Sequence, residues 1–104
     1  MKKYNVDVSE LAENDLRDII HYISTQLSAP MSAENMLDEI ERSISTLDEF
    51  PYRHPKVMDE LLATRGYRIL AVKNYIAFYT IDEQSKTVNV ERILYARRDW
   101  AQLL

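Results

Sequence analysis

The sequence predicts an α+β domain in which a small, twisted, mainly antiparallel sheet packs on a helical hairpin. Three observations predict this fold: residues 66–99 contain three consecutive strand patterns, residues 9–49 contain two amphipathic helical patterns, and a short strand pattern precedes them. The order is strand, helix, helix, strand, strand, strand, and we expect a short helix at the C-terminal end. At 104 residues, the chain fits a single domain spanning residues 1–104.

The first strand is predicted at residues 4–8, where apolar and polar residues alternate. Ser9 follows and is placed to cap a helix, because its side chain can accept a hydrogen bond from a free backbone N–H. Apolar residues at helical spacing predict that this helix continues to about Ser28.

Pro30 interrupts the helical pattern, because proline cannot continue the backbone hydrogen bonds. Ser32 is the predicted cap of the second helix, which runs to about Glu49. Each helix has one apolar face and the connection is short, so the two helices should lie antiparallel and cover a sheet. Residues 50–64 are predicted as a loop, since two prolines argue against a helix. Residues 57–62 fit either a helical turn or an edge segment.

The three later strands are predicted at residues 67–72, 75–82 and 87–95, which are rich in β-branched and aromatic residues. A connection of only two residues, 73–74, requires a hairpin. The 75–82 strand is apolar on both faces, which predicts a central position. On the last strand, Arg92 shares a face with apolar residues. This predicts either a bulge that changes the phase or partial burial of Arg92 against an acidic residue.

Charge is distributed unevenly along the chain. Residues 1–64 hold six Lys and Arg against thirteen Asp and Glu, whereas residues 65–104 hold seven against four, within a net charge of −4. This permits a local anion-binding face on the strands. The absence of cysteine excludes disulfides, and no apolar run is long enough to span a membrane, so we expect a cytoplasmic protein.

The two histidines do not form a metal motif. His21 is expected to lie on the surface of the first helix. His54 would be a candidate general base if the loop folds over the sheet.

Several segments in a fixed order resemble the RelE/ParE superfamily of bacterial toxins. They are Phe50-Pro51, Gly66-Tyr67-Arg68, the strand Asn74-Tyr75-Ile76-Ala77-Phe78-Tyr79, and Arg92-Ile93-Leu94-Tyr95-Ala96-Arg97-Arg98-Asp99. The resemblance covers essentially the whole chain. It implies a small toxin that a co-expressed antitoxin neutralises by wrapping an extended or helical segment around it, with DNA contacted only through the antitoxin.

The resemblance leaves three functions open. RelE-like members cleave messenger RNA in the ribosomal A site, which is our first hypothesis, and no cofactor is then expected. ParE-like members inhibit DNA gyrase without catalysis of their own. A non-toxic relative would only bind its antitoxin.

Metal-independent RNA cleavage requires a base for the ribose 2′-hydroxyl, cations for the phosphate and rings that stack on bases. Arg68 and Arg97 match positions at which RelE-like enzymes often carry phosphate-binding arginines. Tyr95 is the candidate for stacking or proton transfer, and these three are the predicted catalytic residues. The predicted substrate-binding residues are Arg65, Lys73, Arg92 and Arg98.

Two features favour the ParE-like alternative. The chain is net acidic, whereas proteins that act on ribosomal RNA are typically basic. Asp59 and Glu60 occupy the segment in which RelE-like enzymes usually carry lysines or a Glu/His. For the antitoxin, we predict binding across apolar surface left by the sheet and the helical hairpin, with its acidic residues reaching the arginines.

Overall fold

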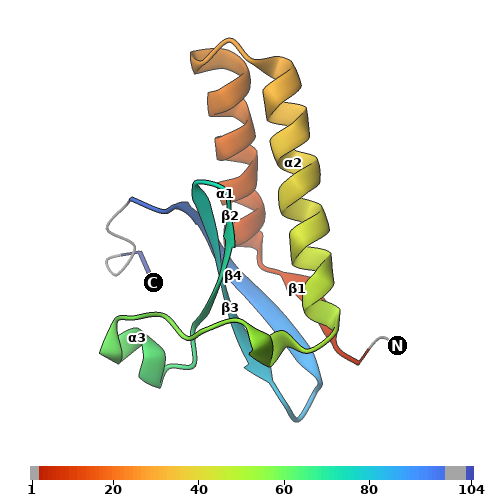
Figure 1. Cartoon of the computed structure of the whole chain (residues 1–104), viewed down its shortest axis with the longest axis vertical. Helices are drawn as coiled ribbons and strands as arrows, with labels where there is room; N and C mark the ends of the chain where they lie inside the picture. Colours follow the sequence, from red (N-terminus) through yellow and green to blue (C-terminus); the bar gives the residue numbers. More distant parts are fainter. Residues whose placement is uncertain (1–2, 98–102) are drawn as a thin grey trace.

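A computed structural model describes residues 3–97 and 103–104 of the chain. The main elements are β1 (Asn5–Val8), α1 (Glu10–His21), α2 (Pro30–Ser45), α3 (Glu60–Thr64), β2 (Arg68–Val72), β3 (Tyr75–Asp82) and β4 (Thr87–Tyr95). Figure 1 shows α1 and α2 side by side, with their far ends extending beyond the sheet. The α+β order is therefore as predicted. The predicted C-terminal helix falls largely on residues 98–102, outside the described part of the chain.

The strands form one sheet of four in the order β1-β4-β3-β2. β1 is parallel to β4, and the other two pairings are antiparallel. The mainly antiparallel sheet and the interior position of β3 are confirmed. The hairpin between β2 and β3 turns at Lys73, whose positive φ of 54° supplies the tight reversal.

A bulge in β4 explains the mixed pattern around Arg92. The register with β3 skips Glu91 between Phe78 and Tyr79, so Glu91 is an extra residue on its strand. The side chains of β4 alternate between the two faces of the sheet, and the bulge shifts this alternation by one residue. Arg92 is also paired with an acidic residue, Asp15 of α1, so both alternatives predicted from the sequence occur together.

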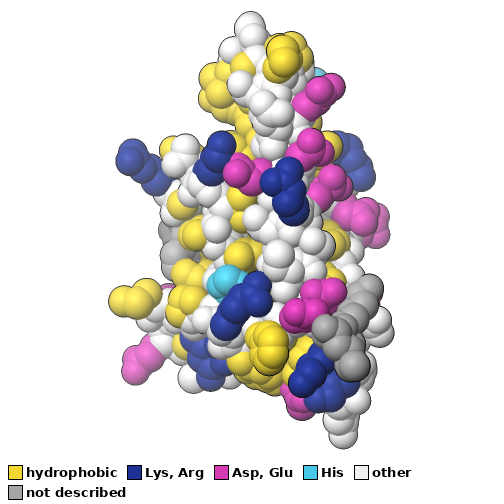
Figure 2. Space-filling view, turned by 45° about the vertical axis from the view of Figure 1, so that its right-hand side comes forward, with side chains coloured by type: hydrophobic (Ala, Val, Ile, Leu, Met, Phe, Trp, Pro, Cys, Tyr) yellow, Lys and Arg dark blue, Asp and Glu magenta, His cyan; other side chains and the backbone are white. Residues whose placement is uncertain are grey.

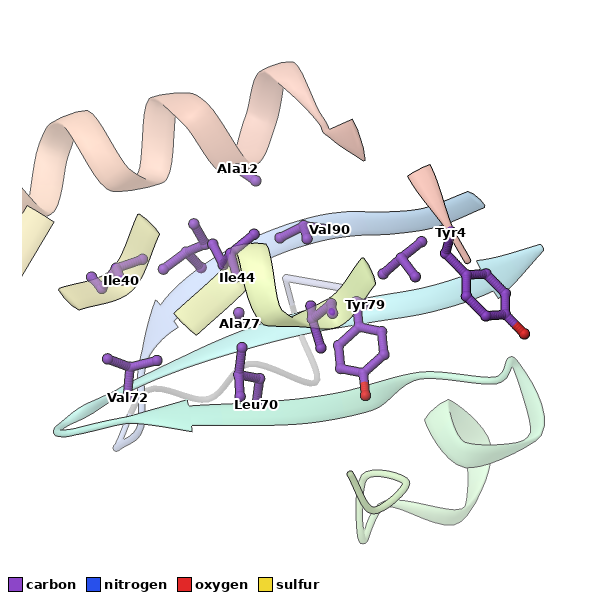
Figure 3. Packing of buried hydrophobic residues seen from close by; sticks show 12 residues of the cluster. Tyr4, Ala12, Ile40, Ile44, Leu70, Val72, Ala77, Tyr79 and Val90 are labelled. Atoms are coloured by element: carbon purple, nitrogen blue, oxygen red, sulfur yellow. The ribbon is translucent and has the colours of Figure 1, made fainter. Parts of the chain in front are cut away.

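Buried side chains form a cluster on each face of the sheet. Figure 3 shows Ala12, Ile40 and Ile44 on the helical side of the larger cluster, and Leu70, Val72, Ala77 and Val90 on the strands. The smaller cluster contains Val57, Leu62, Phe78 and Leu94, with Leu103 and Leu104 packed against it. The face opposite the helices is therefore covered in part by the segment before β2 and by the last two residues.

Helices α1 and α2 begin in different ways. The Ser9 side chain accepts a hydrogen bond from the Ala12 N–H at 3.0 Å and donates one to the Glu91 carbonyl at 2.9 Å, which confirms the predicted cap. The predicted cap at Ser32 is wrong, because α2 already begins at Pro30. Proline suits the first helical position, since the N–H that it lacks would have no helical partner.

The first helix does not remain α-helical to about Ser28. It changes after His21 to a π-helical segment, η1 (Tyr22–Gln26). The hydroxyl of Thr25, within this segment, donates to the carbonyl of His21, just before it, at 2.7 Å. Ser28 then adopts a left-handed backbone, with φ of 50°, and reverses the chain into α2. Short π-helical segments are uncommon and often occur at functional sites.

The segment before β2 combines the two predicted alternatives. Lys56 forms an isolated antiparallel bridge with Arg68 at the edge of the sheet, and α3 follows. The prolines do not exclude all helix, because Pro51 opens a 3₁₀ turn, η3 (Pro51–Arg53), and a second turn, η2 (Thr46–Asp48), directly follows α2. The loop is therefore more ordered than the sequence predicted.

Candidate functional site

The predicted catalytic residues fall at two ends of the sheet. Arg68 of β2 pairs with Tyr79, whereas Tyr95 of β4 pairs with Tyr75. These two partners lie four positions apart on β3, which corresponds to about 13 Å along an extended strand. Arg97 lies two residues beyond Tyr95 and is exposed. The structure therefore brings Arg97 near Tyr95 and leaves Arg68 apart from both.

Arg68 is held by the loop that crosses the edge of the sheet. Its Nη1 donates to the carbonyls of Tyr52 at 3.2 Å and His54 at 2.6 Å. Its guanidinium carbon lies 5.1 Å from the centre of the Tyr52 ring, in cation–π contact. The loop thus folds over the sheet, which is the condition on which a role for His54 depends.

The His54 imidazole lies beside Arg53 in a setting that favours its neutral form. Its ring stands edge-on to Tyr79 with centroids 6.4 Å apart, and Arg53 Nε donates to His54 Nε2 at 3.3 Å. Burial, and then the charge of Arg53, lower the pKa of His54 below its usual value of 6.5. Tyr79 anchors the same loop, because its buried hydroxyl donates to the Pro51 carbonyl at 2.6 Å. Burial raises the pKa of Tyr79 to about 12.

A carboxylate lies on the other side of Tyr52. Glu83 accepts hydrogen bonds from the hydroxyls of Tyr52 at 2.7 Å and Tyr4 at 3.0 Å, and it pairs with the Lys86 ammonium. Hydrogen bonds from Lys86, Tyr52 and Tyr4 lower the pKa of Glu83 to about 2. Arg68 is thus separated by one tyrosine from a permanent negative charge. This cluster could not be predicted from the sequence, because its members come from distant segments.

Arg92 is fully engaged by the protein. Its Nε and Nη2 donate to the two carboxylate oxygens of Asp15 at 2.7 and 2.8 Å, and its Nη1 donates to the Leu103 carbonyl at 3.1 Å. The hydrogen bond to Asp15 raises the pKa of Arg92. Three of the five N–H groups of this guanidinium are thus used within the protein, and its charge is already paired with a carboxylate.

The remaining predicted cations lie apart from one another. Lys73 pairs with Glu39 of α2 at 3.2 Å, at the β2–β3 hairpin. Arg65 is exposed at the end of α3, and Arg98 is outside the described residues. Figure 2 shows Lys and Arg side chains distributed over the face in view, with hydrophobic and acidic side chains between them. The basic side chains on this face therefore do not form one continuous patch.

A sizeable cavity lies at the hairpin end of the sheet. Its volume is about 730 Å³, and it opens between the π-helical end of α1 and the adjoining ends of β3 and β4. It is lined by Asp15, Asp18, Ile19, Tyr22, Leu27, Asn74, Tyr75, Ile93, Leu94 and Tyr95. Of the predicted site residues that the structure describes, only Tyr95 belongs to this lining. The sequence did not predict the cavity, because its walls come from residues far apart in the chain.

Among the residues that the structure describes, no group of three or more histidine or acidic side chains is placed to hold a metal ion. The described helices also include none that combines the length and apolar character required to cross a membrane.

The fold is shared with solved toxin structures. The chain is 18% identical to a chain of the chromosomal ParDE system from P. aeruginosa, with a TM-score of 0.72 and coverage of 91% of this chain and 98% of that one. A chain of the RelBE2 toxin–antitoxin complex from Mycobacterium tuberculosis is 23% identical, with a TM-score of 0.63 and coverage of 91% and 93%. These similarities define the class of fold as that of the toxins in toxin–antitoxin systems.

The sequence assigns the family within this class. Residues 6–100 match the family described as the ParE toxin of the type II toxin–antitoxin system parDE, and the chain belongs to this family. A comparison with curated proteins found no match. The resemblance to the RelE/ParE superfamily is therefore confirmed.

Proposed function

We propose that this type II toxin is neutralised by a cognate antitoxin and arrests growth by binding DNA gyrase, without cutting RNA. The observation that supports this choice is the separation of Arg68 from Tyr95 and Arg97 on the sheet. Metal-free RNA cleavage needs base, cation and acid within hydrogen-bond reach of one phosphate. A separation of about 13 Å along β3 is too large for these residues to act on one phosphate.

Two other basic residues are already paired with carboxylates, which also supports inhibition by binding. Arg92 is bound to Asp15 and Lys73 to Glu39, so two of the four predicted substrate-binding residues already have anionic partners. Membership of the ParE family points to gyrase, the target that the superfamily resemblance implied for ParE-like members. An antitoxin partner is supported by the solved complexes that share the fold.

The gyrase proposal is tested with purified toxin in a supercoiling assay on relaxed plasmid. We expect loss of supercoiling and accumulation of cleaved DNA as toxin is added, and recovery when the co-purified antitoxin is supplied in equal amount. Unchanged supercoiling with a toxin preparation that arrests growth on expression would overturn the proposal. Absence of growth arrest on expression would instead identify a relative that only binds its antitoxin.

A second candidate function rests on the environment of His54. The neutral imidazole, the neighbouring Arg53 and Arg68, and the exposed Tyr52 ring supply a base, cations and a stacking surface for RNA. If this group cleaves messenger RNA on ribosomes, His54→Ala should lower the rate about 100-fold. Arg97→Ala is the matched control, because Arg97 lies at the other end of the sheet, and it should then leave cleavage unchanged.

A further inference from the structure

The cavity at the hairpin end of the sheet contains three tyrosines from three separate segments. Tyr22 comes from η1, Tyr75 begins β3 and Tyr95 ends β4. The rings of Tyr75 and Tyr95 are 5.7 Å apart between centroids, with their planes at 64°. All three tyrosines line this one cavity. Burial, and then the proximity of Tyr95 and Tyr22, raise the pKa of Tyr75. Aromatic ring faces carry negative potential and attract cations.

Two carboxylates line this cavity, and only one of them is paired with a described residue of the chain. Asp15 holds Arg92 with both oxygens and also accepts the Ile93 N–H at 3.0 Å. The carboxylate of Asp18, one turn further along α1, makes no hydrogen bond or ion pair with any residue that the structure describes. The charge that remains unpaired in the described lining is therefore negative.

The rim of the cavity is apolar and exposed. Among the lining residues, Leu27 is 57% exposed and Tyr22 is 51% exposed. A small free cation would leave these side chains in water, whereas a polypeptide that inserts one side chain would cover them. The rim therefore favours a protein segment as the source of the cation.

We propose that this cavity receives an arginine or lysine side chain of the antitoxin. The proposal rests on the antitoxin partnership stated above and adds the chemistry of one contact. Three aromatic rings and one unpaired carboxylate are the groups that proteins use to hold a cationic side chain. The contact has the opposite sign to the one predicted from the sequence, in which acidic antitoxin residues reach toxin arginines.

The basic groups of this chain near the cavity must be considered as competitors. Arg92 is held by Asp15, and Lys73 by Glu39. Arg97 follows Tyr95 by two residues, is exposed and has no ion pair with a described residue, so it is the alternative occupant from this chain. The test must therefore include an Arg97→Ala variant.

The first experiment measures the chemistry of the cavity without the antitoxin. N-acetylarginine methylamide is titrated into toxin carrying ¹³C-labelled tyrosine rings, and N-acetylglutamate methylamide serves as the matched anionic probe. We expect saturable shifts of the Tyr22, Tyr75 and Tyr95 ring signals with the arginine probe alone, with a Kd on the order of millimolar. Tyr22→Leu and Asp18→Asn should each weaken binding about 3-fold, while Tyr22→Phe, which keeps the ring, should bind within about 2-fold of the original protein.

The proposal fails if no saturable shift is seen or if the two probes act alike. Binding that is observed only in the Arg97→Ala variant would assign the cavity to this chain's own arginine and would also overturn the proposal. Because neither gyrase nor ribosomes are present, these outcomes are independent of the toxin's target.

The second experiment tests whether an antitoxin side chain occupies the cavity. The Kd of the toxin–antitoxin complex is measured for Tyr22→Leu and Tyr22→Phe, and each Arg and Lys of the antitoxin is changed to Gln. We expect Tyr22→Leu to weaken the complex about 10-fold and one antitoxin substitution to be non-additive with it, as for residues in contact. Unchanged affinity in Tyr22→Leu would overturn the proposal. Gyrase inhibition by the free Tyr22→Leu toxin, assayed in parallel, reports on the proposed function separately.

Discussion

Arg92 shows how the fold can use a charged residue that looks available in the sequence. Its guanidinium joins α1 to β4 through Asp15, and both side chains are largely buried, with 17% and 13% of their surface exposed. Removing one partner would leave the other charge buried without compensation, which is the costly case for an ion pair. Its role in the described structure is therefore to fasten the helix to the sheet.

We predict that Asp15→Ala lowers the free energy of unfolding by about 3 kcal/mol. The reason is the unpaired Arg92 guanidinium together with the lost contact to the Ile93 N–H. Urea unfolding measures the change. The control is the double variant Asp15→Leu with Arg92→Met, which removes both charges and should recover most of the loss. A loss below about 1 kcal/mol in the single variant would place this pair among weak surface ion pairs.

Glu83 makes a second prediction at the scale of a single residue. Its pKa of about 2 in the folded protein lies below its ordinary value of 4.5. The folded state therefore favours the ionised carboxylate, and this stabilisation is present above about pH 4.5 and disappears as the pH falls toward 2.

We expect Glu83→Gln to lower the Tm above pH 5 and to have a shrinking effect between pH 4.5 and 2. Thermal unfolding of both proteins across this range tests the sign of the dependence. A Tm difference that stays constant or grows as the pH falls would contradict the hydrogen-bonded carboxylate.

At the scale of elements, α3 ends in a Schellman motif that depends on the only glycine of the chain. The Gly66 N–H donates to the Ala63 carbonyl at 3.0 Å and the Tyr67 N–H donates to the Leu62 carbonyl at 3.3 Å. Gly66 has φ of +85°, and a Cβ at this position would meet no atom within 4 Å. A substitution here therefore changes backbone strain without creating a steric clash.

Gly66→Ala should lower the free energy of unfolding by about 1 kcal/mol, because alanine is disfavoured at positive φ. Gly66→Asn is the matched control and should lose less, since asparagine tolerates this conformation better. Chemical denaturation of the three proteins measures the order. Equal stability of Gly66→Ala and the original protein would show that the turn relaxes to another conformation.

Strong periodic patterns made most elements predictable from the sequence. The strands at 75–82 and 87–95 begin and end at the predicted residues, because alternation and β-branched residues act locally. The π-helical end of α1 and the start of α2 at Pro30 were not predicted. Both depend on how the helical hairpin turns, which involves contacts outside the local pattern.

The candidate site was less predictable than the fold. The sequence identified Arg68 and Tyr95 as residue types suited to RNA chemistry, but strand register decides which of them meet. The Tyr52–Glu83 contact and the cavity around Tyr22 combine segments that are remote in sequence. Such combinations follow only from tertiary packing.

For the whole molecule, the uneven charge of the two halves of the chain is partly resolved by internal pairing. Acidic residues of the helices reach basic residues of the strands, as Asp15 does with Arg92 and Glu39 with Lys73. The basic excess of residues 65–104 is thereby used in part to hold the two layers together. This pairing explains why a basic segment in the sequence need not create an anion-binding face.

The most direct test of the proposed mode of action is an assay of messenger RNA cleavage on programmed ribosomes, with the same toxin preparation that inhibits gyrase. We predict that transcripts stay intact at toxin concentrations that abolish supercoiling, because Arg68 is about 13 Å along the sheet from the end that carries Tyr95 and Arg97. Toxin-dependent cleavage in the ribosomal A site at those concentrations would contradict it.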